Sequence, residues 1–153
     1  MALKGKRQNF AETAAFRLNA VAERGYFVML DTANEGYVKV VDSGVSTNSR
    51  LVGCLLNDVI TDESTTRPVN FQKAFEAWVG DKVPVLEAGR ILTDVVVGTA
   101  TAVSAGLTAY VNSSGVLTTE SGWSTFKHRK VGVFETALDS DGYTRVRFNC
   151  IQN

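Results

Sequence analysis

The stretch that decides the fold is VGVFETALDSDGYTRVRFN, residues 131–149. Two segments, Val131–Thr136 and Tyr143–Phe148, flank the sequence LDSDG, and aspartate, serine and glycine are residues that favour tight turns. The second segment alternates arginine with apolar residues, so an extended chain places Arg145 and Arg147 on one face. This pattern predicts an antiparallel hairpin with one apolar face and one polar face.

Similar short apolar segments, separated by turn residues, precede this hairpin. The expected strands are residues 26–30, 37–41, 51–56, 83–86, 91–97, 107–111 and 116–118. We interpret Glu87-Ala88-Gly89 as a turn between 83–86 and 91–97, and Asn112–Gly115 as a hairpin turn, because Asn and Gly tolerate positive φ. The sequence therefore predicts a mainly β fold, a compact antiparallel β-barrel or β-sandwich.

The length of 153 residues suits one domain, which we expect over residues 25–153 after an N-terminal arm at 1–24. Residues 57–80 form a possible loop-rich insertion that starts with a polar surface loop at 57–68, and residues 120–129 are expected to be a second exposed loop.

Two segments fit both a helix and a strand. Residues 10–24 carry helix-capping signals, but their apolar positions form no single stripe, and residues 69–79 match both periods. We favour an extended or irregular chain in the first segment and a strand in the second.

The arm differs in charge from the chain that follows it. Residues 1–24 carry five basic and two acidic side chains, whereas residues 31–94 carry ten acidic and six basic ones. Such an arm suits an acidic surface on a neighbouring subunit, although a solvated tail explains the charge equally well. The residues that we expect at the interface with a neighbouring subunit or a larger assembly are Lys4, Lys6, Arg7, Phe10, Phe16 and Arg17.

The composition excludes several classes of protein. Sixteen basic and sixteen acidic residues cancel, which argues against a general nucleic-acid binder. No apolar stretch reaches the roughly 20 residues that span a bilayer, and the N-terminus lacks the apolar core of a signal peptide. Cys54 and Cys150 lie in apolar runs and belong to no ligand motif, so we expect buried free thiols and assembly in a reducing compartment.

Residues capable of catalysis are sparse. His128 is the one histidine, and it lies in the basic run FKHRK at 126–130, where a solvated role explains it better than general-base chemistry. The chain contains no G-x-S-x-G elbow and no phosphate-binding glycine loop, and the sequence DSDG at 139–142 lacks the later carboxylate of a calcium loop. We therefore expect no catalytic residue, no cofactor and no metal.

Three segments together resemble the capsid decoration (cement) proteins of tailed bacteriophages. They are VPVLEAGRILTDVVVG at 83–98, AYVNSSGVLTT at 109–119 and VGVFETALDSDGYTRVRFN at 131–149. The resemblance covers most of residues 20–150 and rests on strand pattern and glycine placement. It implies a β-barrel or β-sandwich that assembles as a homo-oligomer, with a trimer favoured. It further implies a protein made in the host cytoplasm that binds the major capsid protein on the outer capsid surface and bridges neighbouring capsomers.

Two other functions remain open on the sequence. A β-rich binding module for carbohydrate or a host surface receptor would use Trp78, Trp123 and the tyrosines as a stacking surface. A hydrolase would need His128 beside a nucleophile in a cleft. A row of exposed aromatic side chains in a groove would favour the binding module.

Overall fold

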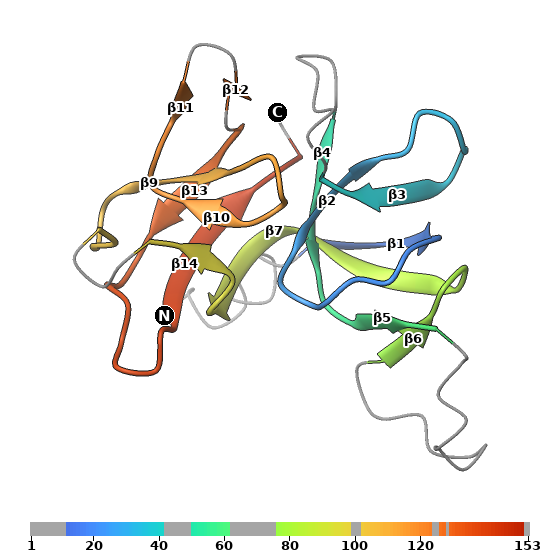
Figure 1. Ribbon diagram of the computed structural model, residues 1–153, viewed down its shortest axis with the longest axis horizontal. Coiled ribbons are helices and arrows are strands. Elements are labelled where there is room, and N and C mark those ends of the chain that lie inside the picture. The colour runs from blue at the N-terminus through green and yellow to red at the C-terminus, as the bar shows by residue number, and fades with distance from the viewer. Residues whose placement is uncertain are drawn as a thin grey trace, which may run out of the picture.

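The computed structural model describes residues 12–41, 50–61, 76–98, 102–123, 126–127 and 129–151. These residues form β-strands, turns and loops, and they include no helix (Figure 1). The prediction of a mainly β fold is confirmed. The strands are β1 (Glu12–Leu18), β2 (Phe27–Leu30), β3 (Tyr37–Val40), β4 (Leu51–Leu55), β5 (Asp58–Ile60), β6 (Glu76–Trp78), β7 (Lys82–Thr93), β8 (Val96–Val97), β9 (Thr108–Val111), β10 (Leu117–Thr118), β11 (Gly122–Trp123), β12 (Phe126–Lys127), β13 (Arg129–Phe134) and β14 (Thr144–Asn149).

Five strands close into a barrel in the order β1-β3-β2-β4-β7. The ring is completed by β1, which pairs antiparallel with β7 from Glu12 opposite Ala88 to Arg17 opposite Lys82, and parallel with β3. Closure leaves none of these five strands with an open edge inside the ring.

The second half of the molecule is a curled sheet in the order β7-β14-β13-β9-β10-β8. Two residues separate β7 from β8 along the chain, yet β8 pairs with β10 at the opposite edge of this sheet. The sheet must therefore curve back toward its own first strand. In Figure 1 it occupies the left side, next to the barrel on the right.

The long strand β7 belongs to both halves. Its first part pairs with β1 and β4, and its second part, from Ala88 to Thr93, pairs with β14. The prediction of two strands separated by a turn at 87–89 is therefore wrong. The glycine at position 89 lies inside the strand, opposite Phe148, at the point where β7 passes from the barrel to the curled sheet.

Two hydrophobic cores share the wall formed by β2 and β4. Along β2, Val28 points into the barrel core, while Phe27 and Met29 point into the core of the curled sheet. Strand β4 is buried at all five positions, with Leu51 and Cys54 in the core of the curled sheet and Val52 and Leu55 in the barrel core, and its pairing with β2 contains a register shift between Gly53 and Leu51. A strand that is covered on both faces needs apolar residues at successive positions, which explains the unbroken runs FVML and LVGCL.

The hairpin turn at 112–115 attaches the curled sheet to the barrel wall. The amide of Phe27 donates a hydrogen bond of 2.8 Å to the carbonyl of Gly115, which has a φ of 78°. A Cβ at position 115 would lie 2.8 Å from the Phe27 carbonyl oxygen, so glycine provides both the conformation and the space. The Phe27 ring also meets Phe148 edge-on, with 5.1 Å between centroids.

The two predicted hairpins are confirmed, and the expected strands at 26–30 and 37–41 form a third. Strand β2 pairs with β3, β9 with β10 and β13 with β14, all antiparallel. The polar segments were predicted less well, because Asp58–Ile60 forms strand β5 within the expected loop at 57–68, and β11 pairs with β12 within the expected loop at 120–129. Residues 69–79 yield strand β6 at Glu76–Trp78, while 69–75 lie outside the described residues.

The range expected for the N-terminal arm, residues 1–24, includes residues that form part of the barrel. Residues 12–18 are strand β1 of the barrel, and Ala22 pairs with Val59 beside β5. This segment is extended, as we favoured, but it is part of the folded body because its pairing closes the barrel. Residues 1–11 lie outside the described residues.

Candidate interaction surface

The outer face of β7, β14 and β13 carries three arginines. Strand register places Arg145 opposite Leu92, and Arg147 opposite Arg90 on one side and Val133 on the other. Thr144, Val146 and Phe148, which alternate with these arginines, are buried. The predicted one-sided placement of Arg145 and Arg147 is therefore confirmed, and both side chains are exposed. We call Arg90, Leu92, Arg145 and Arg147 the arginine face.

One acid partly neutralises this face. Arg90 Nε lies 2.9 Å from Glu135 Oε1, in a pair that is largely exposed on the arginine side. No hydrogen bond or ion pair from the side chains of Arg145 and Arg147 is found among the described residues. Like charges directly opposite each other in a sheet are destabilising, so the pair Arg147 and Arg90 is unfavourable in the isolated chain. Leu92, in the same face, is 66% exposed.

An open groove of about 470 Å³ runs beside these arginines. Its walls come from β7, β13, β14 and the residues just after β14, and they include Arg90, Arg147, Val133 and Ile151. The small residues Ala88, Gly89 and Gly132 also line the groove. The groove thus combines apolar surface with two guanidinium groups, which suits a partner that carries carboxylates.

Two of the four residues in the arginine face, Arg145 and Arg147, are predicted from the alternation in their strand. Arg90 and Leu92 are not predicted to lie beside them, because the interpretation of residues 87–89 as a turn separates this segment from the strand before it. The signal for them was present, since Arg90 and Leu92 continue the strand at a spacing of two residues.

Two of the six residues expected at an interface, Phe16 and Arg17, lie in strand β1 of the barrel. Phe16 is half-buried in β1 and packs against the barrel core, and Arg17 Nη1 donates a 2.9 Å hydrogen bond to the carbonyl of Gly80. Phe16 therefore contributes to the packing of the barrel, and the exposed Arg17 side chain contacts the backbone beyond β6. The other four residues, Lys4, Lys6, Arg7 and Phe10, lie outside the described residues.

A second groove, of about 540 Å³, lies where the barrel meets the curled sheet. It is lined by residues that include Glu23, Asp58, Asp94, Tyr26 and Tyr143. The groove is acidic and polar, and its two tyrosines are the aromatic side chains among the lining residues.

The described residues hold little chemistry for catalysis. Among them, no group of three or more histidines, cysteines or carboxylates has the arrangement of a metal site. Cys54 and Cys150 are free and buried, as predicted, and burial raises the pKa of each thiol to about 12. The environment of His128 lies outside the part of the chain that the structure describes. Within that part, no helix is long and apolar enough to cross a membrane.

Comparison with known proteins yields a similarity of fold. No protein-family model matches the chain, and no curated protein matches its sequence. The structure is similar to a chain from the capsid of Myoviridae phage XM1, with a TM-score of 0.58 and 17% sequence identity. The alignment covers 91% of this chain and 83% of that chain. The shared architecture thus extends over both the barrel and the curled sheet.

Proposed function

We propose that this chain is a structural protein of a phage virion that binds the outer surface of the capsid and bridges neighbouring capsomers. The observation that carries the proposal is the similarity of fold, over 91% of the chain, to a chain from a phage capsid. The closed barrel and its shared wall supply a stiff body of the kind that such a role needs. The protein acts as a homo-oligomer, with a trimer favoured, and catalyses no reaction.

The arginine face is the surface that we assign to the shell. Its exposed leucine and its guanidinium groups suit an acidic surface of the major capsid protein, where the arginines gain carboxylate partners that they lack in the described chain. A single contact through these four residues would be weak. Many copies on one lattice strengthen it, because each bound site raises the effective concentration at the next.

The experiment is co-sedimentation of the purified protein with empty shells assembled from the major capsid protein of the same virus. The expected result is saturable binding that weakens at high salt, since exposed charges are screened. Reversing two charges, with Arg145→Glu and Arg147→Glu together, should lower the affinity at least about tenfold. A matched variant with Arg50→Glu and Lys82→Glu, two exposed positions on the barrel, should bind as the wild type does. Absence of wild-type binding to shells would refute the proposed function.

The polar groove supports one alternative, a module that recognises carbohydrate. Tyr26 and Tyr143 line this groove together with carboxylates, a combination that stacks on sugar rings and accepts hydrogen bonds from hydroxyls. A glycan array probed with the wild type and with Tyr143→Ala tests this alternative. A glycan that binds the wild type and not the variant would favour it over the capsid role.

A further inference from the structure

The arginine face carries a negative charge at one end. Strand β7 places Arg90 and Leu92 on its outer face, and Asp94, the next residue in this alternation, directly follows the strand and is exposed. Thr93, between Leu92 and Asp94, is buried. No hydrogen bond or ion pair from the Asp94 side chain is found among the described residues. The outer face of β7 therefore runs from a base through an exposed leucine to an acid.

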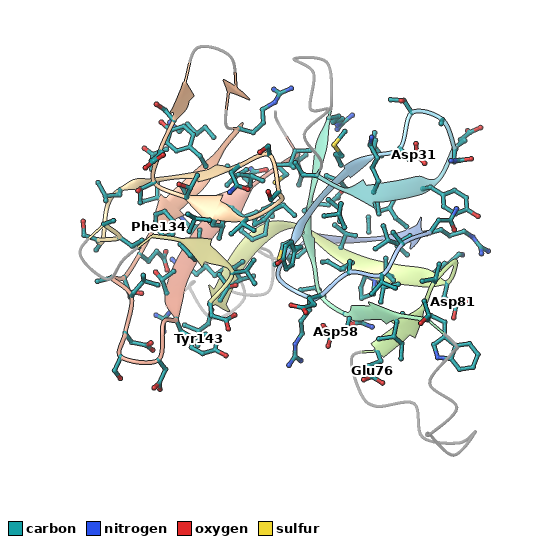
Figure 2. All side chains as sticks on the ribbon, viewed as in Figure 1. Asp31, Asp58, Glu76, Asp81, Phe134 and Tyr143 are labelled. Carbon is teal, nitrogen blue, oxygen red and sulfur yellow. The ribbon has the colours of Figure 1, made fainter. Side chains whose placement is uncertain are left out.

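The neighbouring strand ends at the same acidic side. Thr144 is opposite Thr93 in the strand register, so Tyr143 lies beside Asp94. Both residues line the polar groove, together with Asp58 of the barrel, and Figure 2 shows Tyr143 and Asp58 on either side of the boundary between the two halves. The negative end of the face thus continues into the acidic groove, whereas the positive end borders the other groove.

This gradation makes the face complementary to a second copy of itself. Arg90 and Asp94 are four residues apart, about 13 Å along a strand, and Leu92 lies halfway between them. A two-fold axis that crosses the strands at Leu92 exchanges the two ends, so Arg90 of each copy lies opposite Asp94 of the other. The same rotation places Arg147 opposite Tyr143 of the other copy, where a guanidinium can stack on the ring. Such a reciprocal pattern is the property of an isologous interface.

We propose that two free copies of this chain associate through the arginine face, with Leu92 at the two-fold axis and Arg90 against Asp94 of the other copy. Leu92, which is 66% exposed in the single chain, then gains an apolar contact with its own counterpart. Two sheets packed face to face are an ordinary arrangement. The dimer is a form of the free protein and needs no shell.

One consequence rests on the proposed function. Because the same face is assigned to the shell there, dimer formation and shell binding exclude each other, and each bound site takes up a monomer.

Arg145 opposes the contact between two copies. It is opposite Leu92 in the strand register and therefore lies next to the same axis, where the guanidinium groups of the two copies approach each other. Like charges that face each other across an interface are unfavourable, and exposed ion pairs such as Arg90 with Asp94 each contribute little. The dimer is therefore weak. On an acidic shell, in contrast, Arg145 is attracted, so it acts with opposite sign in the two contacts.

The experiment is sedimentation velocity of the purified full chain at concentrations up to about 1 mM, where weak contacts are populated. We expect an equilibrium of monomer and dimer that shifts toward monomer at high salt. Asp94→Lys should lower the dimer affinity at least about tenfold, because it places two bases opposite each other. The matched control is Asp81→Lys, which makes the same change of charge at an exposed position of the barrel and should associate as the wild type does.

Two further samples test the geometry of the dimer. Arg90→Glu alone should weaken association, and a chain with both Arg90→Glu and Asp94→Lys should regain it, because each reversed residue again meets an opposite charge. Arg145→Gln should tighten the dimer at least about threefold and weaken shell binding, so one substitution moves the two contacts in opposite directions. Circular dichroism and melting temperature check that each variant folds, and all substituted positions are exposed.

A wild type that stays monomeric at about 1 mM would overturn the inference. An effect of Asp94→Lys no larger than that of Asp81→Lys would overturn it, as would an Arg145→Gln dimer weaker than the wild type's. Failure of the double reversal to regain association in folded protein would also overturn it. These measurements use the protein alone, so their failure leaves shell binding untouched, and a lack of shell binding leaves the dimer untouched.

Discussion

Replacing Gly132 by alanine tests the packing on which the groove and the arginine face depend. Gly132 lies in β13 opposite Phe148 of β14. A Cβ at this position would overlap the Arg147 carbonyl oxygen and would lie 2.7 Å from the Phe148 Cα. Ordinary contacts of a Cβ are 3.4–4 Å, and the obstructing atoms are backbone, so β13 and β14 must separate. Gly132 has no positive φ, and space alone therefore decides the effect.

The cost has two parts. Overpacking that shifts backbone costs about 1–3 kcal/mol, and each ladder hydrogen bond that is lost costs about 1 kcal/mol more. We therefore expect Gly132→Ala to lower the free energy of unfolding by about 2–4 kcal/mol, a large part of the total of about 5–15 kcal/mol for a domain. For a chain of this length the melting temperature should fall by about 5–15 °C.

The assay is thermal and urea unfolding, with Gly106→Ala as the matched control. Gly106 has a φ of +90° and no atom within 4 Å of its added Cβ, so alanine there meets only the left-handed backbone cost of about 1 kcal/mol. The two variants share the same chemical change and differ in the space available. Equal losses of stability in the two variants would refute the packing argument, as would a smaller loss for Gly132→Ala.

Three further predictions concern the barrel, the thiols and one turn. Deleting residues 2–11 should leave circular dichroism and melting temperature nearly unchanged, whereas deleting 2–18 removes β1, opens the barrel and should abolish cooperative unfolding; two deletions of equal stability would contradict the closed ring. Cys54 and Cys150, with pKa values raised to about 12 by burial, should not react with a thiol reagent at pH 8 until the protein unfolds. The folded pKa values lie above the ordinary value of 9.0, so above pH 9 the unfolded state loses thiol protons that the folded state keeps. The contribution of these two thiols to the free energy of unfolding should therefore be constant below pH 9 and fall as pH rises toward 12, which urea titration at several pH values measures. Asp139→Ala removes the carboxylate oxygen that accepts hydrogen bonds from two turn amides and should cost about 1 kcal/mol in the same titration; an unchanged midpoint would show that the turn does not need it.

The hairpins are predictable from the sequence because the signals for their turns are local. In the 138–142 turn, Asp139 Oδ1 accepts hydrogen bonds from the amides of Asp141 and Tyr143, and Gly142 has a φ of 84°. Asn112 binds the amides of Ser114 and Val116 in the same manner. These residues set the turn by contacts within four positions of the chain, so their types alone predict it.

The missed elements depend on distant partners. The polar segment Asp58–Ile60 becomes strand β5 because β6 and Ala22 pair with it, and nothing within the segment indicates those partners. The residues 87–89 stay extended because β14 pairs with Ala88 and Gly89 from about 60 residues away. The arginine face assembles from such pairings, which explains why alternation within one strand predicts the shared face of Arg145 and Arg147 but not that Arg90 and Leu92 lie opposite them.

Strand β7 connects the two halves of the molecule. Its first part closes the barrel, and its second part forms one side of the arginine face. The wall of β2 and β4 is buried on both faces and bonded to the hairpin turn through Phe27, so bending one half against the other would open both cores. The barrel and the arginine face are therefore held in fixed relation to each other. For the shell-binding role that we propose, this stiffness means that the bound surface cannot yield by bending between the two halves, so each contact of the face would act on the whole molecule.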